Sequence, residues 1–206
     1  MIAIIDYDAG NLRSVQKALN FIGEEATITR DKDILKRADK VILPGVGAFG
    51  EAMNKLRSYD LIPTIKEIAT SNTPFLGICL GMQLMFEGSE ESPDYEGLNL
   101  LPGKILRIPD KEGLKIPQIG WNSLEYMNQA SLYEGLADQS YVYFVHSYYL
   151  KASNRLDVAA STEYSTLIDA SVEHKNLFGC QFHPEKSGDV GLKILKNFAN
   201  LKKTER

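Results

Sequence analysis

Short apolar runs alternate with longer amphipathic segments through the first half of the chain. Four apolar runs bounded by turn residues are typical of buried strands: residues 2–5, 26–29, 41–43 and 74–78. Three segments with apolar side chains at helical spacing are expected to be helices: residues 11–22, residues 52–69 with a break near Pro63, and the segment from Leu80 to a stop at Gly88. This alternation predicts a parallel sheet covered by helices on both faces.

The pattern changes after about Gly103, where short β-prone runs follow one another without long helical segments between them. These runs are residues 105–108, 123–126, 141–145, 158–161, 167–172 and 177–181. Such a series predicts an antiparallel or mixed extension of the sheet, and residues 191–201 are expected to close the chain as a helix. With no repeat or linker, residues 1–206 are expected to form one α/β domain, a three-layer open sheet that is mostly parallel.

Composition narrows the classes of protein. The chain has 206 residues, a formal net charge of −4 and 44% hydrophobic residues, which argues against a nucleic-acid binder that works by charge. No stretch approaches the ~20 apolar residues of a membrane helix, so no membrane partner is expected. Two cysteines are too few for a disulfide framework, and the first residues do not resemble a signal peptide. A cytoplasmic location is the expectation.

Cys79 lies between the apolar run 74–78 and the helix that follows it, with Gly77 and Gly81 two positions to either side. This is the G-x-nucleophile-x-G pattern of a nucleophile elbow, here with cysteine instead of serine. The glycines allow a tight turn, and a helix N-terminus favours a thiolate. The competing interpretation is a structural cysteine buried in a strand, which is the commoner fate of a free cysteine.

A cysteine nucleophile needs a base, and the base needs an orienting group. His183 follows the run 177–181, and Glu185 comes two positions later, on the same side of an extended chain. Pro184 is expected to keep this segment out of a helix. A carboxylate beside an imidazole fixes its tautomer, although a surface His–Glu pair would have the same spacing.

The other two histidines are weaker candidates. His146 ends an aromatic run, YVYFVHSYY, and has no carboxylate nearby in sequence, so a structural or substrate-lining role is expected. His174 lies between two β-prone runs and is expected in a solvated turn.

The segment LPGVGAFGEAM contains Gly45, Gly47 and Gly50 at the spacing of a dinucleotide-binding fingerprint. It follows the third strand instead of the first, and no strand with a terminal acid appears about 20 residues later. The same glycines suit a loop whose backbone N–H groups bind a developing oxyanion, next to Cys79 at the ends of neighbouring strands. Nucleotide binding is therefore disfavoured.

Six motifs together resemble the class I, triad-type glutamine amidotransferases, and among them the glutaminase subunits of imidazole glycerol phosphate synthases. The motifs are DYDAGNLRSV, LPGVGAFGEAM, GICLGMQLMFEGSEE, IGWN, YVYFVHSYY and FHPEKS, spread over nearly the whole chain. The resemblance implies hydrolysis of L-glutamine to glutamate and ammonia through a cysteine thioester. It also implies a heterodimer in which the ammonia passes to a (β/α)₈-barrel cyclase subunit that makes imidazole glycerol phosphate and aminoimidazole carboxamide ribotide in histidine biosynthesis. No cofactor and no metal are implied.

The same resemblance assigns roles to single residues. The implied triad is Cys79 as nucleophile, His183 as base and acid, and Glu185 as its orienter. Oxyanion and substrate contacts are implied for Val46, Gly47, Leu80, Gln83, His146 and Ser147. The cyclase interface is implied to include Asn11, Trp121, Tyr143 and Lys186.

Three positions depart from the wider amidotransferase pattern. Met82 stands where other glutaminases usually have histidine, and Val46 where they have glycine; both fit the subfamily. Asp8 stands where glycine is expected, which affects the contacts of the first loop and not the chemistry.

Other functions remain open on this sequence. GWN and HPEKS argue against partners of pyridoxal phosphate or anthranilate synthesis, but a paralogue serving surface-sugar amination would share the motifs. Two alternatives belong to a different class: a binding subunit without catalytic activity, and a cysteine hydrolase of another substrate. The complete Cys/His/Glu set argues against a subunit without catalytic activity.

Overall fold

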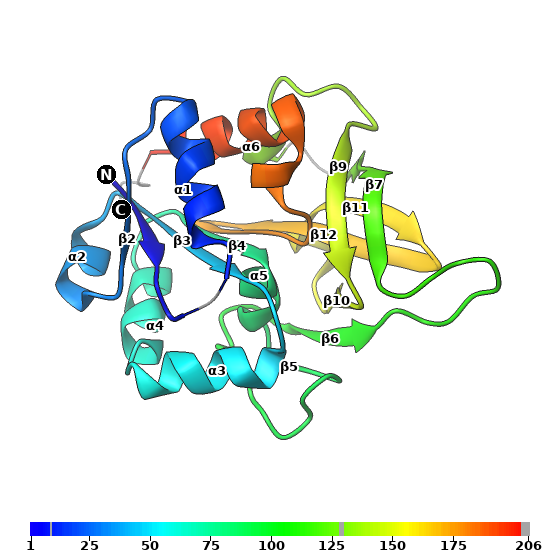
Figure 1. Ribbon diagram of the computed structural model, residues 1–206, viewed down its shortest axis with the longest axis horizontal. Coiled ribbons are helices and arrows are strands. Elements are labelled where there is room, and N and C mark those ends of the chain that lie inside the picture. The colour runs from blue at the N-terminus through cyan, green and yellow to red at the C-terminus, as the bar shows by residue number, and fades with distance from the viewer. Residues whose placement is uncertain (9, 128–129, 203–206) are drawn as a thin grey trace.

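Three layers make up the computed structural model, which describes residues 1–8, 10–127 and 130–202 (Figure 1). Helices α1 (Leu12–Phe21) and α6 (Gly188–Asn200) lie over one face of the central sheet. Helices α3 (Phe49–Ser58), α4 (Ile62–Thr70) and α5 (Leu80–Leu84) lie over the other. This is the predicted α/β architecture.

The central sheet contains eleven strands within the described residues. They are β1 (Ile2–Ile5), β2 (Ala26–Thr29), β3 (Lys40–Gly45), β4 (Phe75–Cys79), β5 (Gly88–Ser89), β6 (Gly103–Arg107), β8 (Glu125–Tyr126), β10 (Tyr148–Ala152), β11 (Val158–Tyr164), β12 (Thr166–His174) and β13 (Leu177–Cys180). The main path runs β2-β1-β3-β4-β13-β12-β10-β6-β5, and β11 pairs with β12 and β8. The first five strands of this path are parallel.

The extension beyond β13 is mixed, as the sequence predicted. Strand β12 is antiparallel to β13, β11 and β10, and β10 is antiparallel to β6, while β5 and β6 are parallel. Strands β7 (Gln118–Ser123) and β9 (Tyr141–His146) form a separate antiparallel ribbon, with Trp121 opposite Tyr143. The order of strands in the sheet therefore places β13, from near the end of the sequence, next to β4, which ends in Cys79.

Every element predicted in the first half is present, although the helix expected from Leu80 to Gly88 ends at Leu84, and one helix and the short strand β5 were not predicted. The segment 52–69 divides into α3 and α4, and Pro63 lies in the first turn of α4, where it removes no internal hydrogen bond. Helix α2 (Lys32–Arg37) was not predicted, because its six residues include only two apolar ones. The Asp31 side chain accepts from the N–H groups of Asp33 and Ile34, and this N-cap was the available signal.

The second half differs from the sequence prediction in more places. Strands β7 and β10 were missed as separate strands: β7 contains three polar residues, and only Ser147 separates β10 from the aromatic run of β9. The 3₁₀ turns η1 (Ser131–Tyr133), η2 (Arg155–Asp157) and η3 (Pro184–Lys186) were also missed. His174 is not in a turn: it ends β12, with Nδ1 2.8 Å from an Asp157 carboxylate oxygen.

Alternation along the buried strands divides the core between the two faces of the sheet. In β1, Ala3 and Ile5 face the α3/α4/α5 side, and Ile2 and Ile4 face the α1/α6 side. Because both faces are covered, the strand is apolar at every position, as expected for a parallel sheet. Within the three described ranges, no helix is both long and apolar enough to cross a membrane.

Helix α5 lies directly against the backbone of β3, with no side chain between them. A Cβ atom on Gly81 would be 1.7 Å from the Leu43 carbonyl oxygen, and one on Gly77 would be 2.7 Å from the Met82 backbone. Glycine at 81 is therefore a packing requirement, and it fixes the start of α5 relative to the carboxyl ends of β3 and β4.

Gly81→Ala should lower the free energy of unfolding by roughly 1–3 kcal/mol or more, the usual cost of overpacking a core. By helix propensity alone, alanine is about 1 kcal/mol more favourable than glycine. A loss of stability in Gly81→Ala would therefore come from the clash with the Leu43 carbonyl oxygen. Denaturant unfolding of both proteins measures the difference. Gly88→Ala is the matched control, because its Cβ would meet nothing closer than the Tyr95 carbonyl oxygen at 3.5 Å. A Gly81→Ala protein as stable as this control would contradict the assigned packing.

Candidate active site

Cys79 occupies a strained turn between β4 and α5. Its φ of 52° and ψ of −113° are rare for a residue with a side chain, and they occur at the point where the strand becomes the helix. The residue is 7% exposed, and the amide nitrogen of Gln181 lies 3.7 Å from its Sγ atom. This is the geometry expected of a nucleophile elbow, with the thiol presented at the end of the parallel strands.

The glycine loop after β3 lies beside this cysteine. Gly45 is paired with Cys79 in the register of β3 and β4, so the two strand ends are adjacent, as the sequence predicted. Val46 is 40% exposed and keeps a negative φ, while Gly47 has a φ of 105°. The positive-φ position of the loop is thus the glycine and not the valine.

His183 and Glu185 contact each other through a tight turn. Nδ1 of His183 is 2.8 Å from Oε1 of Glu185, and both side chains are almost fully buried. The expectation of an extended segment was wrong: Pro184–Lys186 forms the 3₁₀ turn η3, with His183 as its N-cap residue. Proline is compatible with the first position of such a turn, because no internal hydrogen bond needs its missing N–H.

Strand β9 holds this turn in place. The backbone N–H of His183 donates to the Tyr143 carbonyl at 3.0 Å. The Ser187 hydroxyl donates to the His183 carbonyl at 2.6 Å and accepts from the Tyr143 N–H at 3.0 Å. From the other side, Gly191 of α6 packs against the Pro184 carbonyl, where a Cβ atom would come within 1.9 Å.

The environment of His183 favours its protonated form. Burial alone lowers the pKa of His183, but the neighbouring Cys79 side chain and the Glu185 carboxylate outweigh burial, and the net pKa is raised. Its Nε2 atom is buried and has no hydrogen-bond partner within the described part of the chain. Nδ1 is held by Glu185, so Nε2 is the ring nitrogen available for proton transfer.

Cys79 and His183 line one cavity of about 430 Å³, a volume in the range of small-molecule sites. The predicted residues that line it are Val46, Gly47, Cys79, Leu80, Gln83, His146, Ser147, His183 and Lys186. Glu91, Pro117, Val145 and Tyr148 complete the lining.

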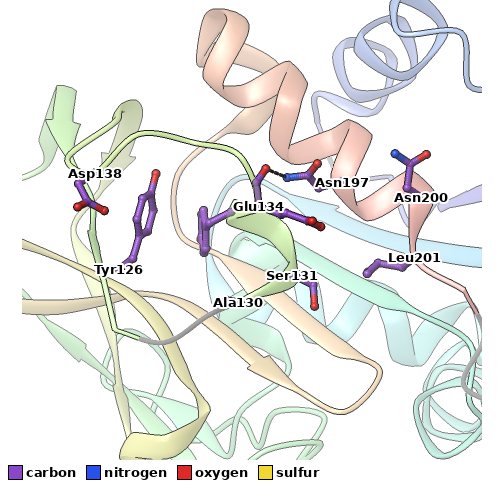
Figure 2. Close-up of a pocket in the computed structure, with 9 residues that line it drawn as sticks. Tyr126, Ala130, Ser131, Glu134, Asp138, Asn197, Asn200 and Leu201 are labelled. Atoms are coloured by element: carbon purple, nitrogen blue, oxygen red, sulfur yellow. Dashed lines mark hydrogen bonds between the residues drawn. The ribbon is translucent and has the colours of Figure 1, made fainter.

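A larger cavity, of about 640 Å³, lies elsewhere, between β8, η1 and the C-terminal end of α6 (Figure 2). Its lining includes Tyr126, Glu134 and Asn197, and the Asn197 amide donates to the Glu134 carbonyl at 2.9 Å. It is lined by neither cysteine nor histidine, so the candidate chemistry belongs to the smaller cavity.

Two glutamines form a buried layer beneath Cys79. The Gln83 amide nitrogen donates to the Tyr148 carbonyl at 3.0 Å and to Gln181 Oε1 at 2.9 Å. Both amide hydrogens of Gln83 are therefore used, and its oxygen is the group left for a ligand. Gln181 was not singled out from the sequence, although its place two residues before His183, at the end of a strand beside β4, was a signal.

His146 is buried in the wall of the cavity, as expected for a structural or lining residue. Nδ1 lies 2.8 Å from the Tyr148 carbonyl oxygen and Nε2 lies 3.0 Å from Oε1 of Gln118. Burial, with a smaller effect from the charge of His183, lowers the pKa of His146 to about 4, so the ring is neutral at pH 7. A neutral ring fits a positioning role better than a second catalytic base.

The residues implied at an interface lie on the β7–β9 ribbon, on turn η3 and at the start of α1. Trp121 is 55% exposed and packs edge-on against Tyr143, with ring centroids 6.1 Å apart, and the Lys186 Nζ atom is 6.0 Å from the Tyr143 centroid. Asn11 contacts the residue before Lys186: its side-chain amide donates to Oε1 of Glu185.

Glu91 is a cavity residue that sequence reasoning missed. It follows the helix stop at Gly88 in a loop with no periodic pattern, so nothing local distinguished it from its acidic neighbours. Its Oε2 atom accepts from the Phe49 N–H at 2.7 Å, which places a carboxylate near the glycine loop. Within the three described ranges, no group of three or more His, Cys, Asp and Glu residues is arranged to hold a metal ion.

Solved structures share this fold. A crystal structure described as a glutamine amidotransferase aligns with a TM-score of 0.75 and 20% identity, covering 97% of this chain and 100% of that one. The structure of PurLQS from Thermotoga maritima aligns with a TM-score of 0.74 and 20% identity, covering 97% of each chain. At these identities the likeness extends to the fold alone.

Sequence relatives are much closer. The chain is 52% identical over 201 residues to imidazole glycerol phosphate synthase subunit HisH of Bacillus mycoides (strain KBAB4), covering 98% of this chain and 95% of that one. It is 50% identical over 204 residues to the protein of the same name from Bacillus thuringiensis (strain Al Hakam), covering 99% and 96%. The family model for class I glutamine amidotransferases matches residues 3–201. A cysteine elbow and a His–Glu pair on this fold, together with a match over nearly every residue, identify the chain as a member of the class I glutamine amidotransferase family.

Proposed function

We propose that this chain is the glutaminase subunit of imidazole glycerol phosphate synthase. It hydrolyses L-glutamine to glutamate and ammonia, and the ammonia passes to a (β/α)₈-barrel cyclase in the same complex. One observation carries the proposal: Cys79 and His183 line a single cavity, with Glu185 hydrogen-bonded behind the imidazole. The 50–52% identity to the subunits named HisH supports the histidine-pathway partner over that of a paralogue.

The first half-reaction forms a thioester. Cys79 gives its proton to Nε2 of His183, and the sulfur attacks the carboxamide carbon of glutamine. The developing oxyanion is held by the backbone N–H of Leu80, next to the elbow, and by a second N–H from Val46 or Gly47. When the tetrahedral intermediate collapses, His183 returns the proton to the leaving nitrogen and ammonia departs.

The second half-reaction regenerates the enzyme. Water attacks the thioester carbon while His183 accepts one of its protons, and the thiolate leaves as glutamate forms. In both steps the imidazole becomes positively charged while Glu185 stays negative and buried beside it. The raised pKa of His183 reflects this arrangement, because the imidazolium is stabilised where it has to form.

Glutamine recognition needs groups for an ammonium and a carboxylate. Glu91 is the carboxylate in the cavity wall that is not part of the triad, so it is suited to bind the substrate α-ammonium. The oxygen of Gln83 can accept from the same group, since both amide hydrogens of Gln83 are used elsewhere. The backbone at His146 and Ser147 forms the opposite wall and is suited to hold the rest of the substrate.

The cyclase is proposed to cover the open side of the cavity. Trp121, Ile119 and Tyr141 of the β7–β9 ribbon are more than half exposed, which is unusual for such large apolar side chains. The same ribbon holds His183 through Tyr143, and Lys186 of η3 borders both the ribbon and the cavity. A partner bound on this ribbon would receive ammonia directly and would also contact the elements that place the base.

Cys79→Ala should abolish glutamine-dependent synthesis by the complex and leave synthesis from free ammonia intact, because the cyclase chemistry belongs to the partner. Synthesis measured with each nitrogen source tests this. Cys180→Ala is the matched control: Cys180 is buried in β13, its Sγ is 3.9 Å from the Gly77 carbonyl oxygen, and burial raises its pKa. It should keep most of the glutaminase activity. Loss of acylation in a folded Cys180→Ala protein would overturn the assignment of the nucleophile.

His183→Ala should reduce thioester formation by about 10²–10⁴-fold, the usual contribution of a general base. Glu185→Gln should cost less, since it removes the charge and keeps the base. Labelling of Cys79 by a glutamine-analogue affinity reagent measures the first half-reaction directly. A Glu185→Gln protein that reacts more slowly than His183→Ala would reverse the proposed roles.

Val46→Gly should raise glutamate release by the free chain roughly 10-fold. Turning the peptide between Gly45 and Val46 so that its N–H faces the oxyanion would move Val46 to positive φ, at a cost of about 1–2 kcal/mol that glycine does not bear. Val46→Ala is the matched control, because it removes the same methyl groups and keeps the Cβ atom. Glutamate release is compared for the free chain, the complex, and the complex with a cyclase ligand. Equal activity of the Gly and Ala variants would refute a gating role for this peptide.

A further inference from the structure

Asn11 makes an unexpected contact with the catalytic machinery proposed above. Its side-chain amide donates to Oε1 of Glu185, the same oxygen that lies 2.8 Å from Nδ1 of His183. The other carboxylate oxygen, Oε2, is buried and has no hydrogen-bond partner within the described residues. A fully buried carboxylate is stable only with hydrogen bonds or paired charge. For Glu185 both contacts, with Asn11 and with His183, are made at the same oxygen, Oε1.

The conformation of Asn11 supports this function over a structural one. Asn11 is the N-cap residue of α1, where asparagine usually accepts a hydrogen bond from the first turn of the helix. Here its side chain makes no such cap, and its φ of 75° is in the left-handed region. The residue therefore forgoes a common stabilising interaction at this position, and its amide contacts a carboxylate 174 residues away in the sequence.

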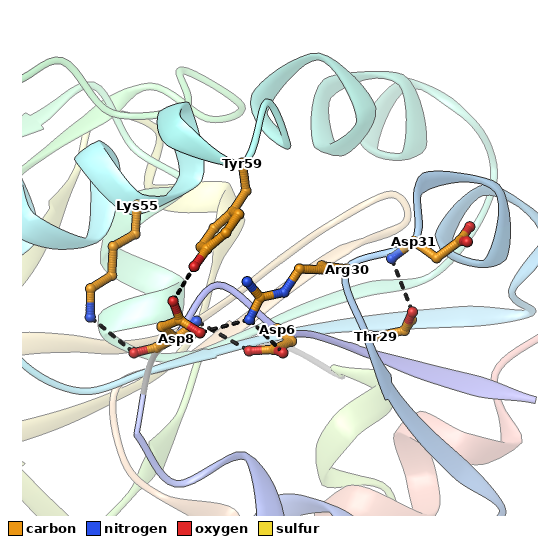
Figure 3. A network of polar contacts seen from close by, with 7 residues as sticks. All are labelled: Asp6, Asp8, Thr29, Arg30, Asp31, Lys55 and Tyr59. Carbon is orange, nitrogen blue, oxygen red and sulfur yellow. Dashed lines mark hydrogen bonds and ion pairs between the residues drawn. The ribbon is translucent and has the colours of Figure 1, made fainter.

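A polar cluster surrounds Asp8, three residues before Asn11 in the sequence (Figure 3). The Asp8 carboxylate contacts Arg30 at 2.6 Å and accepts from the Tyr59 hydroxyl, and the Asp8 carbonyl accepts from Lys55 at 3.0 Å. Arg30 also contacts Asp6 at 2.8 Å and lies 4.0 Å over the Tyr59 ring. These contacts join the end of β1 to the end of β2 and to α3, three residues before Asn11.

We propose that Asn11 is a positioning residue for the His183–Glu185 pair, and that the Asp8 cluster holds Asn11 in place. The inference rests on the proposed glutaminase function. An amide N–H on Oε1 fixes the rotation of the carboxylate, so that Oε1 faces Nδ1 and Nε2 faces the cysteine. It does so without adding a positive charge, which would oppose the imidazolium that forms during each half-reaction. A lysine or arginine at this position would fix the carboxylate equally well and weaken its effect on His183.

The central test is a double-mutant cycle with Asn11→Ala and Glu185→Ala in the full-length chain. Asn11→Ala should lower kcat for glutamate release on the order of 10-fold, the size of one hydrogen bond to a charged group, and change KM little. In the Glu185→Ala background, which leaves no side-chain oxygen at position 185 for Asn11 to contact, the same change should have an effect below about 2-fold. Equal effects in both backgrounds would overturn the proposal.

Asn11→Asp gives an independent readout that a structural role would not produce. It keeps the shape of the side chain but places a second carboxylate against Glu185, and like charges at this distance favour sharing one proton. As pH falls and the introduced carboxyl group becomes protonated, it can donate to Glu185 again. The ratio of variant to wild-type kcat should therefore rise as the pH is lowered from about 8 to about 5.5, while the ratio for Asn11→Ala stays flat. Parallel ratios for the two variants would contradict the proposal.

Two further variants complete the design. Asp8→Gly, which introduces the glycine expected from the family, should lower kcat in the same direction as Asn11→Ala and by a smaller factor. Asn20→Ala, at an exposed position of the same helix, is the matched control and should leave kcat and KM unchanged. If Cys79→Ala kept its glutaminase activity, the proposed function itself would fail. If the Cys79 result holds and Asn11→Ala keeps full kcat, the positioning role alone fails.

Discussion

The close approach of α5 to β3 is the constraint on which the rest of this structure depends. Gly81 leaves no room for a Cβ atom next to the Leu43 carbonyl, and Gly77 leaves none next to Met82. Between these contacts the chain passes directly from strand β4 to helix α5, and Cys79 adopts a strained positive φ at that point. The strain is maintained because packing on both sides determines the turn, and it presents the thiol at the end of the strand instead of inside the sheet.

A second constraint is electrostatic. His183 and Glu185 are both nearly inaccessible, and a buried charged pair is stable only if its geometry and hydrogen bonds are good. The fold meets this requirement from three directions: β9 holds the backbone of His183, α6 packs on the Pro184 carbonyl, and Asn11 donates to the Glu185 carboxylate. Each of these elements lies far from the others in sequence. Two of these segments, α6 and the start of α1, do not line the cavity, so the site is sensitive to changes outside the cavity wall.

The two halves of the sheet have different functions in this arrangement. The parallel strands β3, β4 and β13 bring the glycine loop, the cysteine and the segment leading to the histidine to one edge, as is usual for ligand sites in such sheets. The antiparallel extension and the β7–β9 ribbon form the other wall of the cavity, and the ribbon exposes large apolar side chains beside it. In the proposed complex, the surface that binds a partner and the strand that holds the base are thus the same ribbon.

The sequence by itself determined the features that depend on local patterns. Apolar runs and helical spacing predicted the parallel layers, and the glycines around Cys79 predicted the turn, because a short loop and a tight approach can be built from few residue types. The proximity of the glycine loop to Cys79 was predicted as well, since strand ends of a parallel sheet meet at one edge. Strand β7, by contrast, has no strong pattern of its own and is defined by its pairing with β9. Only the tertiary structure decided that His183 and Glu185 meet through a 3₁₀ turn. It also placed Gln181 against the cysteine and Glu91 in the cavity wall. It brought Asn11 into contact with Glu185, 174 residues away in the sequence. These contacts depend on which distant segments the fold brings together, and no periodicity in the chain records that information.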